Sequence, residues 1–198
     1  GQNATYNLDT GIAEITGNNL KMTSPNQTLT ARDKFEYFEQ EGRINAIGNA
    51  QVISQKPTGG QDTLNADQIE AILIKDAQGK QTLDTITATN NVIITTPEEK
   101  ITSNQGIYNA TLNTATLTGD GTISATGGSI THDGLISPGN SPGTLTLDAD
   151  VILGNTAEIF IELAGTTPGT DADLLAVVDT LSLDGELSLT LLGGFVPS

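Results

Sequence analysis

Apolar and polar residues alternate along most of the chain. The pattern is clear in residues 44–52 (INAIGNAQV) and 86–94 (ITATNNVII), and a period of two places successive side chains on opposite faces of a β-strand. Helical periodicity is weak. Residues 66–74 (ADQIEAILI) come nearest to it, but their Ile-Leu-Ile end precedes a polar, Gly-containing run and favours a strand entering a hairpin. The pattern predicts an all-β protein.

A two-strand unit recurs in the first part of the chain. An alternating strand leads to a Gly-Asn or Asn-Asn pair, then to a second strand, and then to Leu-x-Ala-Asp or a relative of it. One copy runs through 44–52 to Leu64-Asn65-Ala66-Asp67, and another through 86–94 to Ile101-Thr102-Ser103-Asn104. Such recurrence is typical of stacked units that bury their apolar faces together.

The turns of this unit fall at residues 17, 48, 90 and 119, which are Gly or Asn. Both residue types adopt the positive φ that tight hairpins need. We therefore expect hairpin-like turns at these positions and repeated antiparallel strands in a long, folded-over sheet. Its inner face is then either a packed core or an apolar trough wide enough for a lipid.

The second part of the chain has a different pattern. Ser137-Pro138-Gly139-Asn140-Ser141-Pro142-Gly143 predicts a rigid double turn, and Asp184-Gly185 is a strong hairpin signal. Between such turns the strands alternate regularly, and their aliphatic positions are Leu145, Leu147, Ile159, Ile161, Leu181, Leu183, Leu187, Leu189 and Leu191.

Charge also changes along the chain. The net charge is -16, and all eight Lys and Arg residues precede position 101. Residues 1–119 carry 8 basic and 13 acidic side chains, a net of -5, and residues 120–198 carry 11 acidic ones, a net of -11. This step predicts a domain boundary, or a fusion of two proteins, near Gly119. The scarcity of cations excludes nucleic acid as a partner and disfavours an anionic membrane surface.

Nothing in the sequence indicates catalysis, a metal or a cofactor. Cysteine is absent, which removes thiolate chemistry. His132 beside Asp133 lacks a nucleophile elbow, and Asp171-Ala172-Asp173 lacks the spacing of a cation loop. The start at Gly1 and the absence of a long apolar run lead us to expect a mature, exported protein without a spanning helix.

Residues 1–119 resemble the LptA/OstA-like family of lipopolysaccharide transport proteins. The resemblance rests on Ile-x-Ala-x-Gly-Asn-Ala-x-Val, on the Leu-x-Ala-Asp that follows it, and on Tyr6 and Tyr108, which open matching units. It implies a twisted β-jelly-roll in the periplasm that holds acyl chains of lipopolysaccharide. It also implies end-to-end stacking through edge strands, either with other β-jelly-roll transport proteins or as a homo-oligomer.

The alternating apolar residues of this part are the candidate lipid-binding set. Periodicity alone favours a dry core, and the resemblance adds the acyl-chain interpretation. The set comprises Ile15, Leu20, Met22, Leu29, Phe35, Tyr37, Ile44, Val52, Leu64, Ile69, Leu73, Ile86, Val92, Ile94, Ile101 and Leu117. Candidate ligands for the phosphates of a lipid head group are Lys21, Arg32, Lys34 and Arg43; the alternative is that these cations protect strand edges from aggregation.

The later segment looks like the passenger-associated repeat of autotransporters. The residues that carry this resemblance are 134–147 (GLISPGNSPGTLTL), 173–177 (DLLAV) and 183–187 (LDGEL). It implies a β-solenoid, specifically a right-handed parallel β-helix. The sequence therefore predicts a lipopolysaccharide-binding jelly-roll at 1–119 continued by a solenoid at 120–198. The alternative is a structural or cell-surface β-solenoid, such as an adhesin, that binds no ligand.

Overall fold

The computed structural model describes residues 3–57, 59–75, 78–112, 114–139 and 142–197. These residues form strands and no helix, so the all-β prediction is confirmed. Within them, no helical segment has the length and apolar character needed to span a bilayer. The chain divides into two compact units, residues 1–94 with 105–117 and residues 95–104 with 118–198.

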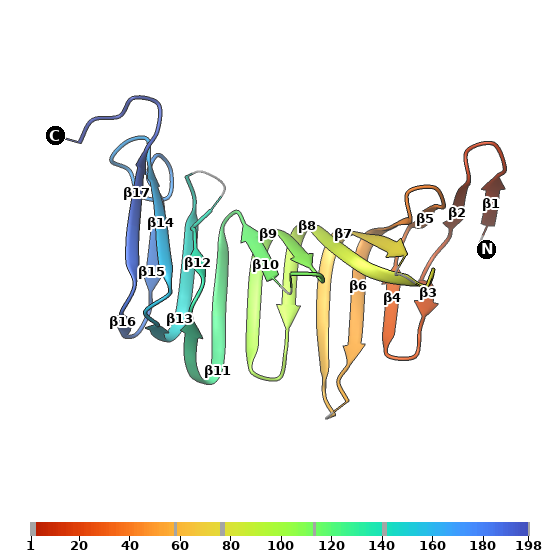
Figure 1. Cartoon of the computed structure of the whole chain (residues 1–198), viewed down its shortest axis with the longest axis horizontal. Helices are drawn as coiled ribbons and strands as arrows, with labels where there is room; N and C mark the ends of the chain where they lie inside the picture. The colour runs from red at the N-terminus through yellow and green to blue at the C-terminus, as the bar shows by residue number, and fades with distance from the viewer. Residues whose placement is uncertain (1–2, 58, 76–77, 113, 140–141, 198) are drawn as a thin grey trace. The chain divides into compact units, whose positions relative to one another are not determined.

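Antiparallel strands build the first unit. Its strands are β1 (Asn3–Asn7), β2 (Ile12–Thr16), β3 (Leu20–Thr23), β4 (Gln27–Ala31), β5 (Lys34–Phe38), β6 (Arg43–Gln55), β7 (Gln61–Lys75), β8 (Gln81–Thr95), the second half of β9 (Glu99–Asn109), and β10 (Thr114–Thr118). The order is β1-β2-β5-β6-β7-β8, while β4 pairs with both β3 and β6 (Figure 1).

Strand β6 belongs to two rows of strands at once. Residues 43–47 pair with β5, and residues 51–54 pair with β4. Between them lies a bulge at Gly48 and Asn49, whose φ values are +88° and +44°. The strand bends there and continues. The Asn90–Asn91 pair, with φ of +60° and +51°, lies inside β8 in the same way.

The hairpin-like turns expected at residues 48 and 90 are therefore wrong. Both positions are corners within long strands. The physical reason is that a bulge uses the same positive φ as a tight turn, so Gly and Asn serve either.

The recurring Leu-x-Ala-Asp motif is explained by these corners. Asp33, which follows the related run Leu29-Thr30-Ala31-Arg32, packs so closely on Gly48 that a Cβ there would overlap its carboxylate. Asp67, from the next copy, accepts a hydrogen bond of 3.0 Å from Asn91 Nδ2. In the second unit Asn104 packs on Gly119 in the same manner. The acidic or amide residue of each copy thus supports the corner of the following strand.

The core of the first unit follows the corners. Its fully buried members are small or lie beside the bend: Leu20, Ala31, Phe35, Ala46, Ala50, Ala66, Ile69, Ala88 and Val92. Alanine lets two rows of backbone approach closely where the strands bend. The packing density of protein interiors leaves no space there for larger side chains.

The second unit changes from antiparallel to parallel pairing at one strand. Strand β11 (Gly121–His132) pairs antiparallel with residues 99–102 of β9 on one side. On its other side it pairs parallel with β13 (Thr144–Leu153), with Ile123 opposite Leu147.

Parallel coils make up the rest of this unit. Strands β12 (Leu135–Ile136), β14 (Glu158–Leu163) and β17 (Glu186–Leu191) form one parallel sheet. In the other sheet, β15 (Leu174–Val177) and β16 (Leu181–Leu183) pair parallel with β13. Residues from both sheets share one core, which includes Leu147, Val151, Leu153 and Ile159. Coils of two parallel sheets around a shared core are the organisation of a β-solenoid.

Asp184–Gly185 does not form the predicted hairpin. It connects β16 in one sheet to β17 in the other, and both strands pair in parallel with earlier coils. Gly185 is required because a Cβ there would overlap the carbonyl oxygen of Ala157. Of the predicted double turn, Asn140 and Ser141 lie outside the described residues; Pro138 is fully buried and Gly139 has a φ of +74°.

Candidate functional site

A row of four aliphatic side chains crosses the first unit. Met22 of β3 lies opposite Leu29 of β4, Leu29 opposite Val52 of β6, and Val52 opposite Leu64 of β7. Leu29, Val52 and Leu64 pack against the core but stay partly exposed, and Met22 is 40% exposed. We call these four residues the inner strip.

Burial falls in steps away from the corner on each of these strands. Every residue of the inner strip lies two positions from a fully buried residue, so both face the same side. The pairs are Leu20 and Met22, Ala31 and Leu29, Ala50 and Val52, and Ala66 and Leu64. Two positions farther out, Gln27, Ser54 and Asp62 form a polar cross-strand row. The surface therefore grades from small and buried, through aliphatic and half-buried, to polar.

The inner strip ends at an unprotected strand. Among the described residues β3 pairs with β4 alone, so it is an edge strand. An extended apolar molecule lying along the strip would cross the strands and leave past β3 at Met22.

Nine of the sixteen candidate lipid-binding residues lie in or against one core cluster. Leu20, Phe35, Ile69 and Val92 are buried in it, and Leu29, Val52, Leu64, Ile86 and Ile94 pack against it. Half-buried positions outside this cluster hold Tyr37, Ile44, Leu73 and Leu117.

Three members of the set do not fit a buried inner face of the first unit. Ile15 and Met22 are exposed, because each lies toward an outer strand of its row. Ile101 belongs to the second unit, where it pairs with Ile123. Alternation alone could not show this, since the unit boundary passes through the middle of β9.

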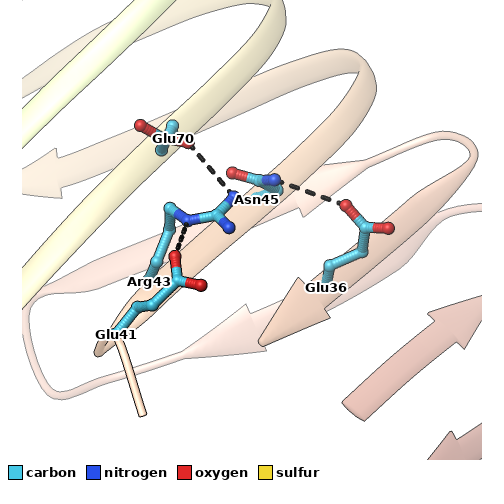
Figure 2. A network of polar contacts seen from close by, with 5 residues as sticks. All are labelled: Glu36, Glu41, Arg43, Asn45 and Glu70. Atoms are coloured by element: carbon cyan, nitrogen blue, oxygen red, sulfur yellow. Dashed lines mark hydrogen bonds and ion pairs between the residues drawn. The ribbon is translucent and has the colours of Figure 1, made fainter. Parts of the chain in front are cut away.

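Two of the four predicted head-group cations each lie beside two carboxylates. Figure 2 shows Arg43, whose Nε lies 2.7 Å from Glu41 Oε2 and whose Nη1 lies 3.4 Å from Glu70 Oε2. Its guanidinium also stacks 3.7 Å from the centroid of the Phe38 ring. Lys34 Nζ lies 2.8 Å from Glu36 and 3.6 Å from Glu14.

These contacts belong to one polar row across four strands. Glu14, Glu36, Asn45 and Glu70 are cross-strand neighbours in register. Asn45 is buried and donates to Glu36 at 3.3 Å (Figure 2). With the amide reversed it would instead donate to Glu70 and accept from Arg43, both at 3.1 Å. Only the reversed orientation gives both ends of the amide a partner. The row therefore stabilises the sheet and offers no vacant cation.

The contact between Lys34 and Glu36 shifts their pKa values in opposite directions. The hydrogen bond from Lys34 lowers the pKa of the Glu36 carboxyl below its usual range, helped by the amide of Asn45. The same bond to Glu36 raises the pKa of Lys34. Both charged forms are therefore favoured in the folded protein.

The other two predicted cations line a hollow of about 470 Å³ beside the corner. Lys21 and Arg32 border it, together with Thr30 and the amides Asn19 and Asn49. Arg32 is paired with Asp33 at 2.7 Å in an exposed position, which raises the pKa of Arg32 and lowers that of Asp33. Lys21 lies opposite Thr30, on the face of β3 that alternates with Met22.

The sequence reasoning missed the amides of this hollow. Asn19 and Asn49 have positive φ, +57° and +44°. From the sequence, Asn49 is assigned only to a turn and Asn19 is given no role. The sequence does hold a signal for them. An Asn at a strand corner projects its polar side chain outward, beside the next strand.

Acidic side chains of the second unit bind the backbone. Asp173 is buried and accepts hydrogen bonds of 2.8 Å from the amides of Gly143 and Glu162. Asp150 accepts from the amide and hydroxyl of Thr180, and these bonds lower the pKa of its carboxyl. In the described part of the chain, no three His, Cys, Asp or Glu side chains gather in a metal-binding arrangement.

Comparison with known proteins gives one distant similarity. No family model matches the chain, and no curated protein matches its sequence. One similar solved structure is LptH, the LptA-homologous periplasmic component of the conserved lipopolysaccharide transport device from Pseudomonas aeruginosa. The TM-score is 0.47 at 10% sequence identity, over 59% of this chain and 77% of LptH. A likeness of this degree establishes no common function.

Proposed function

We propose that the first part of the chain, residues 1–119, is a non-enzymatic periplasmic carrier of lipopolysaccharide. Acyl chains lie against the inner strip, and phosphates of the head group reach Lys21 and Arg32. The observation that carries this proposal is the gradient on three neighbouring strands, β4, β6 and β7, from buried alanine through partly exposed aliphatic residues to polar residues, which β3 extends with Leu20 and Met22. Such a surface suits a molecule that is apolar at one end and charged at the other.

The dimensions of the inner strip suit an acyl chain. Four strands enclose three intervals of about 4.8 Å, which makes an apolar path roughly 14 Å long. A chain on this path leaves at Met22, at the edge of β3. Lys21 is the preceding residue on the opposite face, so a head group that turns around the edge reaches it.

Hydrophobic transfer supplies the retention. Each CH₂ group that leaves water contributes about 0.8 kcal/mol, so even a partly covered chain is held. The cations add charge-assisted contacts with phosphate. Lys34 and Arg43 take no part in this proposal, because each lies beside two carboxylates. Arg32 has a single carboxylate partner, Asp33, in an exposed position.

Stacking through edge strands extends the proposal to partners. All five residues of β1 are exposed, and in the described chain β1 pairs with β2 alone. An unpaired edge of this kind accepts a strand from another β-jelly-roll transport protein or from a second copy. Residues 120–198 then serve as a solenoid joined to the carrier, in keeping with the charge step near Gly119.

The second candidate function is a structural or cell-surface β-solenoid without a ligand. The packed core of the parallel coils favours it, since Leu147, Val151 and Leu153 are almost completely buried. In this case the inner strip is only the partly exposed border of a small core, and it binds no ligand.

Lipid binding by variants of one strand separates the two candidates. Val52 faces the inner strip, and its neighbour Ile53 faces the opposite side with similar partial burial. A fluorescent lipid A analogue, titrated into the full chain, should bind the wild type and bind Val52→Glu at least about tenfold more weakly, because an unpaired carboxylate in the strip is costly to desolvate. Ile53→Glu should stay within about twofold of the wild type. Absence of binding by the wild type, or equal losses in both variants, favours the structural solenoid.

A further inference from the structure

The hollow beside the corner spans three neighbouring strands of the first unit. Lys21 borders it from β3, Thr30 from β4, and Asn49 from the bend of β6. Strand β4 pairs with β3 on one side and with β6 on the other, so the hollow lies over paired strands. Its volume of about 470 Å³ falls within the range of small-molecule sites, which is about 300–1,000 Å³.

Two of the side chains that border the hollow face away from the inner strip. Lys21 directly precedes Met22, and Thr30 directly follows Leu29, so both point to the opposite side of the sheet. They lie opposite one another in register, and Thr30 lies opposite Gln51 of β6. The row is polar, and a ligand can reach it without touching the inner strip.

Three neutral polar side chains border the hollow with their hydrogen-bonding groups unused. Among the described residues, the side chains of Asn19, Thr30 and Asn49 make no hydrogen bond with the rest of the chain. A carboxamide has two donors and an acceptor, and a hydroxyl both donates and accepts. Sugar hydroxyls also donate and accept, so these groups match a sugar ring.

Two cations border the same hollow. In the part of the chain that the structure describes, no carboxylate pairs with Lys21. Arg32 donates to Asp33 through Nε and Nη2, at 2.7 and 2.8 Å, so its Nη1 remains outside that pair. Ammonium and guanidinium groups form short, charge-assisted hydrogen bonds with phosphate oxygens. Cations and uncharged groups that bind hydroxyls thus border one small volume.

We propose that the hollow binds a phosphorylated sugar, with its phosphate on Lys21 and on Nη1 of Arg32 and its ring hydroxyls on the amides of Asn19 and Asn49. The inference rests on the carrier function proposed above for the source of this sugar, which is the lipid head group. The site itself needs no acyl chain, because its polar groups lie apart from the inner strip. A sugar phosphate free in solution has the same chemistry and therefore binds as well.

Calorimetric titration of the full chain with water-soluble probes tests the site. Glucosyl phosphate should bind. Glucose lacks the phosphate and inorganic phosphate lacks the ring, so each should bind at least about tenfold more weakly. Equal binding of glucosyl phosphate and inorganic phosphate would overturn the assignment to a sugar, and absence of glucosyl phosphate binding would overturn the site altogether.

A lysine variant ties this binding to the hollow. Lys21→Met keeps the aliphatic stem and removes the charge, and it should weaken glucosyl phosphate binding at least about tenfold. Lys75→Met is the matched control, because Lys75 is an exposed lysine at the end of β7 and does not border the hollow. It should bind like the wild type. Equal losses in the two variants would mean that the sugar phosphate binds elsewhere.

A corner variant tests the amides. Asn49→Gly removes the carboxamide and keeps a residue that accepts the positive φ of +44°. It should weaken glucosyl phosphate binding by about threefold or more and leave inorganic phosphate binding unchanged, since the amide contacts the ring. Asn91→Gly makes the same change at the corner of β8, away from the hollow, and should have no effect. A loss for both probes in Asn49→Gly would contradict the assigned role.

Lipid A analogues with and without phosphate groups separate this inference from the carrier function. The full chain should bind the phosphorylated analogue at least about tenfold more tightly, and Lys21→Met should remove the difference. Val52→Glu should weaken both analogues alike. Equal binding of the two analogues by the wild type would overturn the head-group sugar as the ligand and leave the carrier function in place. Binding of glucosyl phosphate but of neither analogue would support the site and overturn the carrier function.

Discussion

The two units use similar corner chemistry for opposite strand directions. In the first unit Asp33 packs on Gly48, and β6 continues through the bend to pair antiparallel on both sides of it. In the second unit Asp133 packs on Gly154 equally closely, but there the strand ends and the chain enters the next parallel coil. A glycine supported by a carboxylate therefore specifies a sharp change of direction. Whether the strands on either side run parallel or antiparallel depends on their partners.

Burial also differs between the units. The first unit grades along every strand of one row from a buried residue, an alanine on three of the four strands, to the partly exposed inner strip. The second unit buries Leu147, Val151 and Leu153 of β13, whereas the leucines of β16 and β17 are exposed. Exposed apolar surface thus forms the margin of the core in the first unit, whereas in the second unit it lies on β16 and β17. We expect such a margin to accept a lipid chain.

Loss of a corner should give the largest effect. Gly48→Ala should destabilise the first unit by about 3 kcal/mol, since an L-residue at positive φ costs about 1–2 kcal/mol and the new Cβ overlaps Asp33. Tyrosine fluorescence during urea unfolding measures this, because Tyr6, Tyr37 and Tyr108 all belong to the first unit and the chain has no Trp.

Gly59→Ala provides the control for that variant. Its φ of +87° is nearly the same, but nothing lies within 4 Å of the added Cβ. It should cost only the backbone term, about 1–2 kcal/mol. Equal losses in the two variants would mean that Asp33 does not support the corner.

Removal of a buried carboxylate should weaken the second unit by a smaller amount. Asp173→Ala leaves the amides of Gly143 and Glu162 without their acceptor, and we expect a loss of about 2 kcal/mol. Asp148→Ala, at an exposed position, should change stability by less than about 0.5 kcal/mol. Circular dichroism should report the shift of Asp173→Ala, while tyrosine fluorescence should not. A matching shift of the fluorescence midpoint would show that the two units unfold as one.

Acid should produce the smallest effect, and Glu36 is its test in the first unit. The folded-state pKa of Glu36 is lowered by Lys34, so the stabilisation is complete above the ordinary Glu pKa and disappears as pH falls through the folded value. The Lys34 pKa is raised, so its share persists until the pH rises through that value in the alkaline range. Unfolding free energies at about pH 7 and about pH 3 should differ less in Glu36→Gln than in the wild type. An identical difference would exclude Glu36 as a source of acid sensitivity.

Alternation along the chain predicted the strands and much of the core. Leu20, Phe35, Ile69 and Val92 were expected inside and are buried there. Such residues are predictable because the side-chain period of a strand is a local property. The predicted strand at 66–74 likewise lies within β7.

Pairing partners were not predictable, and the errors follow from them. Gly48, Asn90 and Gly185 signal a turn, but only the neighbouring strands decide between a hairpin, a bulge and a coil corner. Lys34 and Arg43 were candidate lipid ligands until the register placed Glu36 and Glu70 beside them. Cross-strand neighbours come from distant parts of the sequence, so no local pattern reveals them.

Photo-crosslinking at chosen positions tests the proposed carrier most directly. A benzophenone side chain introduced at Met22 or Leu29 lies on the inner strip, one at Ile53 lies on the opposite face, and one at Leu189 lies in β17 of the second unit. With lipopolysaccharide present, the account predicts adducts at Met22 and Leu29 and none at Ile53 or Leu189. Equal labelling at all four positions, or none at Met22 and Leu29, would contradict it.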